Sequence, residues 1–150
     1  MAEPNLRRAT IDDAEQISAV IAEIVRAPEP VALRSALTPD QVRAWIERVG
    51  DQGGLFVCEV EGRIVGFSAL DFNTEEPDVG TLGVWLLASH RKQGLGTALA
   101  ECVLENAREK GFRRIRGRLP QNNEVALSFL SSIGALVPLY NPEARFELPL

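Results

Sequence analysis

The sequence predicts a mixed α/β fold, in which strand hairpins and amphipathic helices share one chain. Two apolar runs at 55–60 and 64–72 are joined by Glu61-Gly62, a dipeptide that is typical of a tight hairpin turn. Apolar residues recur at helical spacing between 95 and 103, as they do on the buried face of a helix. Because hairpins pair strands antiparallel while helices separate other strands, we expect a mixed sheet rather than a purely parallel one.

Composition suits a single globular domain spanning 1–150, because the 150 residues are 45% hydrophobic and 25% charged. A net charge of −5 argues against a general binder of nucleic acid or of anionic membranes. Residues 1–5 lack an apolar signal-peptide core, and no apolar run approaches membrane-spanning length. We therefore expect a cytoplasmic protein, monomer or homodimer, without nucleic-acid or membrane partners.

The two cysteines, Cys58 and Cys102, fall in a strand pattern and on the apolar face of a helix pattern. These positions favour two buried thiols over a disulfide. The sequence shows no spacing of ligand residues that is typical of a metal site, so we expect no metal.

The N-terminal segment predicts a short strand at 6–9, then a helix, then a loop at 26–37 that contains two prolines. Thr10 or Asp12 can cap this helix. Its apolar face consists of Ile17, Val20, Ile21 and Ile24.

A second helix begins at Thr38, which precedes Pro39 at the first helical position. Gln41 completes a capping box with Thr38. The glycine-containing segment 50–54 ends the helix. The residues expected to face inward are Val42, Trp45, Ile46 and Val49.

The second half of the chain predicts further alternation of strands and helices. In order, these elements are an acidic turn at 73–78, a strand at 79–87, a helix at 94–110 closed by Gly111, a half-exposed strand at 112–119, a helix capped by Asn122 or Asn123, and final strands at 135–140 and 144–148.

A glycine-rich turn joins the strand at 79–87 to the helix that follows it. Gly94 and Gly96 let a ligand approach the backbone, and the unpaired N–H groups of a helix start favour phosphate. The alternative is an ordinary strand-to-helix turn. No Walker A motif is present, and Leu99 stands where the dinucleotide fingerprint requires its third glycine.

Arg-x-x-Gly-x-Gly from Arg91 to Gly96, between an apolar strand and an amphipathic helix, resembles the pyrophosphate loop of the GNAT superfamily of N-acetyltransferases. The opening at 6–14 is similar to the family's first strand and helix start. Asn123 to Ala126, with the apolar residues and Ile133-Gly134 that follow, looks like its late helix motif. The resemblance implies a mostly antiparallel mixed sheet of about six to seven strands flanked by about four helices.

The resemblance also implies a mechanism, in which an acceptor amine attacks the thioester of bound acetyl-CoA directly. Backbone amides at Val84 and Leu86 would hold the pantetheine and thioester. Asn123 would contact the pantetheine arm, or serve only as a helix cap. The residues expected to meet the pyrophosphate are Arg91, Lys92, Gln93, Gly94, Leu95, Gly96 and Thr97.

The proton-transfer residues differ from the family pattern. Thr81 stands where many relatives carry a glutamate base, and Leu130 where many carry a tyrosine acid. Tyr140 could replace that acid, although a packing role is the alternative. His90 adjoins the loop and suggests a role beside CoA rather than proton abstraction. The candidate bases, each of which could instead be a solvated side chain, are Asp71, Glu75, Glu76, Asp78 and Glu23.

Three readings of the function remain open. The first is transfer of an acetyl group to a primary amine of a small molecule. The second is acetylation of protein N-termini, and the third is a regulatory acyl-CoA-binding module that has lost the chemistry. The basic run at 113–118 is expected to be a solvated strand face, with steering of the CoA phosphates as the alternative.

Overall fold

The structure, a computed structural model, describes residues 3–26, 36–90, 94–118 and 145–149. Its elements in order are β1 (Asn5–Arg8), the 3-10 turn η1 (Ile11–Asp13), α1 (Ala14–Arg26), α2 (Pro39–Val49), β2 (Gly54–Val60), β3 (Arg63–Asn73), β4 (Glu76–Leu86), η2 (Ala88–His90), α3 (Leu95–Glu109), β5 (Arg114–Arg118) and β6 (Arg145–Pro149).

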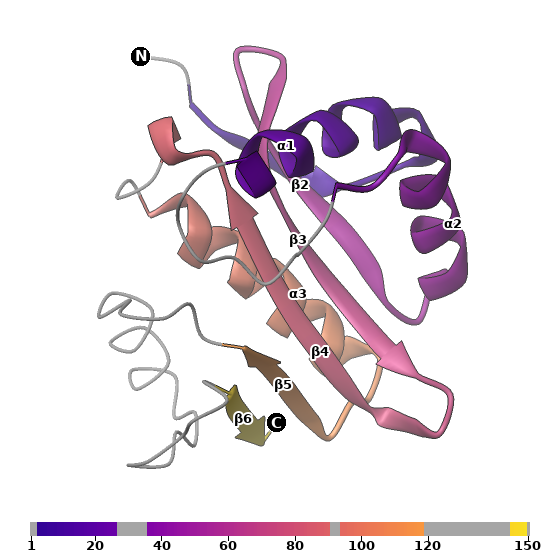
Figure 1. The fold of residues 1–150 in the computed structure, drawn as a ribbon. Coiled ribbons are helices and arrows are strands. Elements are labelled where there is room, and N and C mark those ends of the chain that lie inside the picture. The colour runs from indigo at the N-terminus through magenta and orange to yellow at the C-terminus, as the bar shows by residue number, and fades with distance from the viewer. Residues whose placement is uncertain (1–2, 27–35, 91–93, 119–144, 150) are drawn as a thin grey trace.

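The strands form one six-stranded sheet in the order β1-β2-β3-β4-β5-β6. Four neighbouring pairs are antiparallel, and β4 with β5 is parallel. Figure 1 shows α1 and α2 on the near face of this sheet and α3 on the far face. The prediction of a mixed, mostly antiparallel sheet is therefore confirmed. The described residues contain three α-helices, and the predicted helix after 122 and strand at 135–140 lie outside them.

Local signals in the sequence explain the ends of several elements. Thr38 Oγ1 accepts a hydrogen bond from the N–H of Gln41, and Gln41 Oε1 accepts one from the N–H of Thr38, which completes the predicted capping box. Glu61 and Gly62 both have positive φ, at 54° and 79°, as the predicted two-residue hairpin turn requires. The helix α3 ends before Gly111, whose φ is 82°.

Alternation along the strands divides the core between the two faces of the sheet. On the far face, Ser68 Oγ donates a hydrogen bond to the carbonyl oxygen of Leu99 in α3, at 2.9 Å. The apolar residues packed around α3 include Leu70, Leu82 and Ile115. On the near face, Phe67 packs against Trp45 of α2. The sheet is thus covered on both sides, which explains the nearly continuous burial of 64–70.

A hydrogen-bonded ion network fixes β1 against the start of the first helical segment. Two guanidinium nitrogens of Arg7 donate to the Asp13 carboxylate at 2.8 and 2.9 Å, and a third donates to Glu59. The N–H of Thr10 also donates to Asp13, at 2.8 Å. The guanidinium of Arg7 and the N–H of Thr10 hold the pKa of Asp13 below its usual range, although burial opposes them.

Two predictions need correction. The segment 73–78 is not one acidic turn, because β4 already begins at Glu76 and pairs with Asn73 across a turn of two residues. The pairing of Glu76 with Asn73 of β3 starts β4 at Glu76, so Glu76 and Asp78 belong to the strand. Both cysteines are free as predicted, but only Cys58 is buried, because Cys102 lies at the edge of the apolar face of α3.

Of the helices described, none is both long and apolar enough to cross a bilayer.

Candidate active site

The hydrogen-bonding edge of β4 is the first part of the site. The N–H of Leu87 donates to the carbonyl oxygen of Val65 at 3.0 Å, which continues the β3–β4 register one residue beyond the pair of Gly66 with Leu86. In an antiparallel pair, alternate residues direct their backbone groups toward the partner strand. The backbone groups of Trp85 therefore also point toward β3, while those of Val84 and Leu86 point to the opposite side, toward β5.

On that side, the described strands diverge. The registered pairs between β4 and β5 run from Val79 with Arg114 to Thr81 with Arg116 and include none beyond Thr81. Figure 1 shows β4 and β5 spreading apart toward their C-terminal ends. Val84 lies three residues past the last pair, so its N–H points to the β5 side of β4, where the described strands show no registered partner for it. This unpaired stretch of the strand edge is the opening between β4 and β5.

The start of α3 lies next to this opening. Gly94 caps the helix with φ of 80°, and the carbonyl oxygen of Gly94 accepts the first helical hydrogen bond from Ala98. Leu95, Gly96 and Thr97 come before Ala98 in the helix, so their N–H groups have no acceptor within the helix itself. The first turn carries no acidic residue. Among the described residues, a Cβ built on Gly96 would meet Val84 Cγ1 alone, at 3.9 Å.

These features suit an anionic group at the helix start, because N–H donors and the positive end of the helix dipole are both available there. Predicted contacts at Arg91, Lys92, Gln93 and Asn123 lie outside the described residues. The same holds for the two positions considered for the general acid, Leu130 and Tyr140.

Asp71, a candidate base, lies opposite Thr81 on the near face of the sheet and has many partners. Arg48 of α2 donates two hydrogen bonds to its carboxylate, at 2.6 and 2.7 Å. Trp45 Nε1 donates a third at 2.9 Å, and the N–H of Phe72 a fourth at 2.7 Å. Burial tends to raise the pKa of Asp71, but these donors hold that pKa below its usual range.

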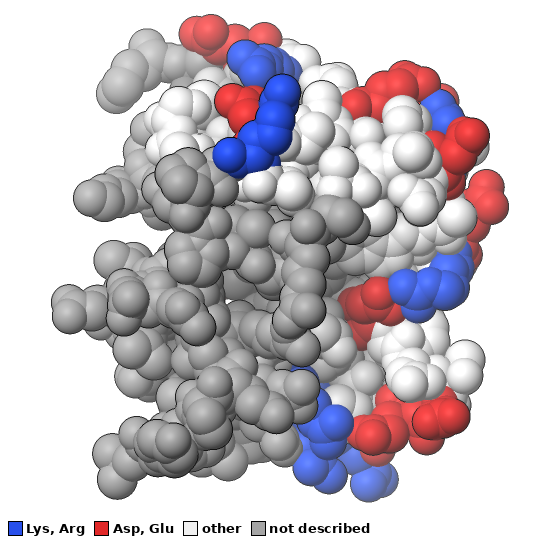
Figure 2. Space-filling view, in the orientation of Figure 1, with Lys and Arg blue, Asp and Glu red and all other residues white. Residues whose placement is uncertain are grey.

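The other acidic candidates near β4 lie at the opposite end of the strand. Glu76 pairs with Arg116 at 3.2 Å, and Asp78 lies 3.8 Å from Arg113 Nε. Figure 2 shows acidic and basic side chains gathered at this end of the molecule, at the lower right. Asp78 precedes Val84 by six residues, which corresponds to about 20 Å along an extended strand. Glu75 is exposed in the turn that precedes β4.

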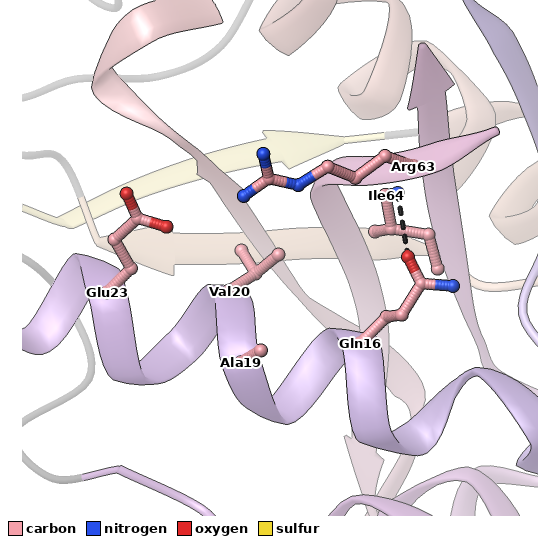
Figure 3. A pocket seen from close by; sticks show the side chains of 6 residues that line it. All are labelled: Gln16, Ala19, Val20, Glu23, Arg63 and Ile64. Atoms are coloured by element: carbon pink, nitrogen blue, oxygen red, sulfur yellow. Dashed lines mark hydrogen bonds between the residues drawn. The ribbon is translucent and has the colours of Figure 1, made fainter. Parts of the chain in front are cut away.

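Glu23 lines a small, open pocket of about 90 Å³ between α1 and the β2–β3 hairpin. Figure 3 shows the guanidinium of Arg63 extending over Val20 toward the carboxylate of Glu23. Gln16 Oε1 accepts a hydrogen bond from the N–H of Ile64 at the other end of the pocket. Val65 bonds to Leu87, which already follows the last residue of β4, and Arg63 lies two residues further from β4 along β3. The pocket therefore lies beyond the C-terminal end of β4 and not beside Val84.

His90 ends η2, directly before the glycine-rich loop. The side-chain Nδ1 of His90 lies 2.9 Å from Ser89 Oγ, and the backbone N–H of His90 donates to the carbonyl oxygen of Leu87. The role of His90 beside CoA stays a prediction.

Sequence reasoning missed an aromatic cluster on the near face of the sheet. Phe67 and Trp85 stack with ring centroids 4.7 Å apart and an interplanar angle of 22°. Trp45 of α2 meets both rings edge-on, at 6.1 and 5.9 Å. Period-two alternation in β4 could have placed Trp85 on the same face as Thr81, but only the packing of α2 brings Trp45 to it.

Comparison with known proteins identifies the family. The model of the acetyltransferase (GNAT) family matches residues 19–135. An uncharacterized N-acetyltransferase of Archaeoglobus fulgidus is 32% identical over 132 residues, covering 85% of this chain and 89% of that protein. The chain therefore belongs to the GNAT family of acetyltransferases.

Two further relatives match over shorter segments. An uncharacterized N-acetyltransferase of Methanocaldococcus jannaschii is 34% identical over 89 residues, covering 56% of this chain and 39% of that protein. The L-2,4-diaminobutyric acid acetyltransferase of Nocardia farcinica is 30% identical over 84 residues, covering 54% of this chain and 42% of that protein. These two matches thus span about two fifths of each relative.

Solved structures of the family share the fold. A GNAT acetyltransferase of Streptococcus pneumoniae superposes with a TM-score of 0.84 at 18% identity, covering 99% of this chain and 100% of that one. A phosphinothricin acetyltransferase of Sinorhizobium meliloti, solved in complex with acetyl-CoA, also reaches 0.84 at 16% identity, covering 98% and 88%.

Proposed function

We propose that this chain transfers the acetyl group of acetyl-CoA to a primary amine of a small molecule by direct attack of the amine on the thioester. One observation carries the proposal: the N–H of Val84 points into the opening between β4 and β5, beside the start of α3. A thioester carbonyl placed in that opening receives a backbone hydrogen bond, which strengthens as negative charge develops on the oxygen. The family relationship supplies acetyl-CoA as the donor.

The residues present fit the phosphates of CoA. In the part of the chain that the structure describes, a Cβ on Gly96 would have only Val84 Cγ1 in contact, and the first turn of α3 carries no acidic residue that would repel an anion. Thr97 is exposed in the same turn, so its hydroxyl is available as a further donor. Arg91 would add positive charge from the preceding loop, and Asn123 would contact the pantetheine arm.

A small-molecule acceptor is supported by the Nocardia farcinica relative, whose name specifies an amino acid with a side-chain amine. An amine of this kind arrives as an ammonium ion and must lose a proton before attack. Asp71 is a poor base because Arg48 and Trp45 occupy its oxygens and its pKa is lowered. The carboxylates at the start of β4 lie about 20 Å along the strand from Val84. We therefore propose that water near Thr81 accepts the proton.

A panel of amines tests this function, with release of free CoA thiol as the measurement. The panel contains small primary amines, amino acids and short peptides with free N-termini. Turnover of the small amines supports the proposal, whereas turnover of peptides alone supports N-terminal acetylation. Binding of acetyl-CoA without any turnover supports the regulatory module.

Two variants of Gly96 test the binding site itself. We expect Gly96→Asp to abolish acetyl-CoA binding, because a carboxylate would occupy the anion site and repel phosphate. Gly96→Ala is the matched control and should bind acetyl-CoA within a fewfold of wild type, because its Cβ meets only Val84 Cγ1 at an ordinary contact distance. Tight binding by a folded Gly96→Asp variant, measured by calorimetry, would refute the assignment.

A further inference from the structure

Trp85 immediately follows the residue whose N–H is proposed to hold the thioester. The side chain of Val84 points to the far face, where Val84 packs with the residues around α3. The side chain of Trp85 therefore lies on the near face, where it stacks on Phe67. Two successive residues thus direct a backbone donor toward the β5 side of β4 and an aromatic ring to the near face of the sheet.

The position of the indole is tightly determined. It lies over Gly83, where a Cβ would come within 2.1 Å of Trp85 Cη2, so only glycine leaves the space that the ring uses. Phe67 supports one side of the ring by stacking, and Trp45 meets it edge-on at 5.9 Å with an interplanar angle of 76°. Trp45 is itself fixed by its hydrogen bond to Asp71. Trp85 nevertheless stays partly exposed.

On the near face, α1 and α2 cover much of the sheet, but Thr81 is exposed and Trp85 partly exposed, so an acceptor can approach Val84 from this side. On the far face, the buried residues Leu82, Ala100 and Val103 fill the space between β4 and α3. An acceptor that approaches a thioester at Val84 from the near face then meets Trp85, the next residue along β4, whose side chain lies on that face. This step rests on the proposed acetyl transfer.

From this arrangement we infer that Trp85 determines acceptor specificity by binding a flat aromatic group of the amine against its indole. The chemistry of the surroundings favours a ring over a charged group. Thr81 is uncharged, and the charge of the nearby Asp71 is balanced by Arg48. An indole that is already supported by Phe67 and Trp45 loses little freedom when a second ring stacks on it.

The experiment compares benzylamine with its saturated counterpart cyclohexylmethylamine, which has nearly the same shape but no aromatic ring. In wild type we expect kcat/KM to favour benzylamine by roughly two- to tenfold, which is the range for a stacked aromatic pair. Trp85→Leu should remove this preference, while Trp85→Phe should retain part of it. The dissociation constant of acetyl-CoA, measured by calorimetry, should stay within about twofold in both variants, because the ring does not lie in the opening.

Phe72→Leu is the matched control. Phe72 is also partly buried, but it lies on the far face in contact with Phe112, so its loss removes a ring without touching the acceptor side. This variant should keep the preference for benzylamine. Thermal unfolding of each variant separates a change in specificity from a loss of folded protein.

The outcomes distinguish this inference from the proposed function. Equal use of the two amines by wild type, or an unchanged preference in Trp85→Leu, overturns the role of Trp85 while acetyl transfer stands. If acetyl-CoA binds but no amine is turned over, acetyl transfer fails. Fluorescence then tests the aromatic site, because Trp45→Phe leaves Trp85 as the sole tryptophan. Saturable quenching by benzylamine with CoA present supports the site, and its absence overturns it.

Discussion

A substitution at Asp71 can distinguish a carboxylate that stabilises the fold from one that acts as the catalytic base. The substitution Asp71→Asn keeps the size of the side chain but leaves one acceptor oxygen in place of two. Asp71 accepts hydrogen bonds from Arg48, Trp45 and the N–H of Phe72 in the native structure. The asparagine can still accept from Trp45, but its amide opposes the guanidinium donors of Arg48.

The expected loss of stability in Asp71→Asn depends on how far the Arg48–Asp71 ion pair is exposed to solvent. A hydrogen bond to a charged group contributes about 1.5–3 kcal/mol when buried, and an exposed ion pair contributes at most about 1 kcal/mol. The side chain of Arg48 is 56% exposed and that of Asp71 is 27% exposed, so solvent screens the pair substantially. We therefore expect Asp71→Asn to lower the free energy of unfolding by about 1–3 kcal/mol.

The pH dependence has a definite sign. The pKa of Asp71 is lowered in the folded protein, so the ionised carboxylate stabilises the fold above the unfolded pKa of about 4. That contribution is lost as pH falls through the lowered folded-state pKa. The difference in unfolding free energy between wild type and Asp71→Asn should therefore be full at neutral pH and should shrink in acid.

Chemical denaturation and thiol-release kinetics together test this prediction. Turnover by the folded variant at saturating acetyl-CoA should fall less than about tenfold, with the acid limb of the pH profile unshifted. Arg48→Met is the matched control and should show a similar loss of stability. A fall in kcat of about 10²–10⁴-fold in Asp71→Asn with stability unchanged would show that Asp71 is the base, and would refute the structural role.

Three further predictions concern other parts of the molecule. Arg91→Ala should weaken acetyl-CoA binding roughly 10- to 150-fold by calorimetry, because a charge-assisted hydrogen bond to pyrophosphate is lost; equal weakening of a pantetheine thioester without phosphates would contradict this. Asp13→Asn should lower the free energy of unfolding by about 1–3 kcal/mol at neutral pH and by less in acid, because the pKa of Asp13 is lowered by Arg7; a constant difference between pH 7 and pH 2 would contradict it. Glu76→Gln should change turnover by less than about twofold, since its carboxylate lies at the far end of β4 and pairs with Arg116; a fall near 10²-fold would identify a base there.

Local sequence signals predicted the elements that depend on a few neighbouring residues. The capping box of Thr38 and Gln41, the hairpin turn at Glu61-Gly62 and the glycine at the start of α3 all occur as predicted. Each involves residues at most four positions apart, so the sequence contains every group that takes part. The family, too, was already indicated by the pattern around Gly94 and Gly96.

Some features of the site could be predicted only in part. Period-two alternation indicated that Val84 and Leu86 direct their backbone groups to the same side. Which side that is depends on the register, which is fixed by the bond from Leu87 to Val65 on another strand. The pairing of β4 with β3 likewise moved the acidic residues at 76–78 from a turn into a strand.

The sequence by itself determined the fold class, the capping box at Thr38, the hairpin turn at Glu61-Gly62 and the start of α3 at Gly94, because these follow from periodicity and local backbone preferences. Only the tertiary structure decided the surroundings of Asp71 and Trp85. Asp71 is bound by donors 26 and 23 residues away in α2, and Trp85 is supported by Trp45 from that helix. Whether a carboxylate is free or an indole is supported depends on which distant residues pack against it, and a pattern of neighbours along the chain does not contain that information.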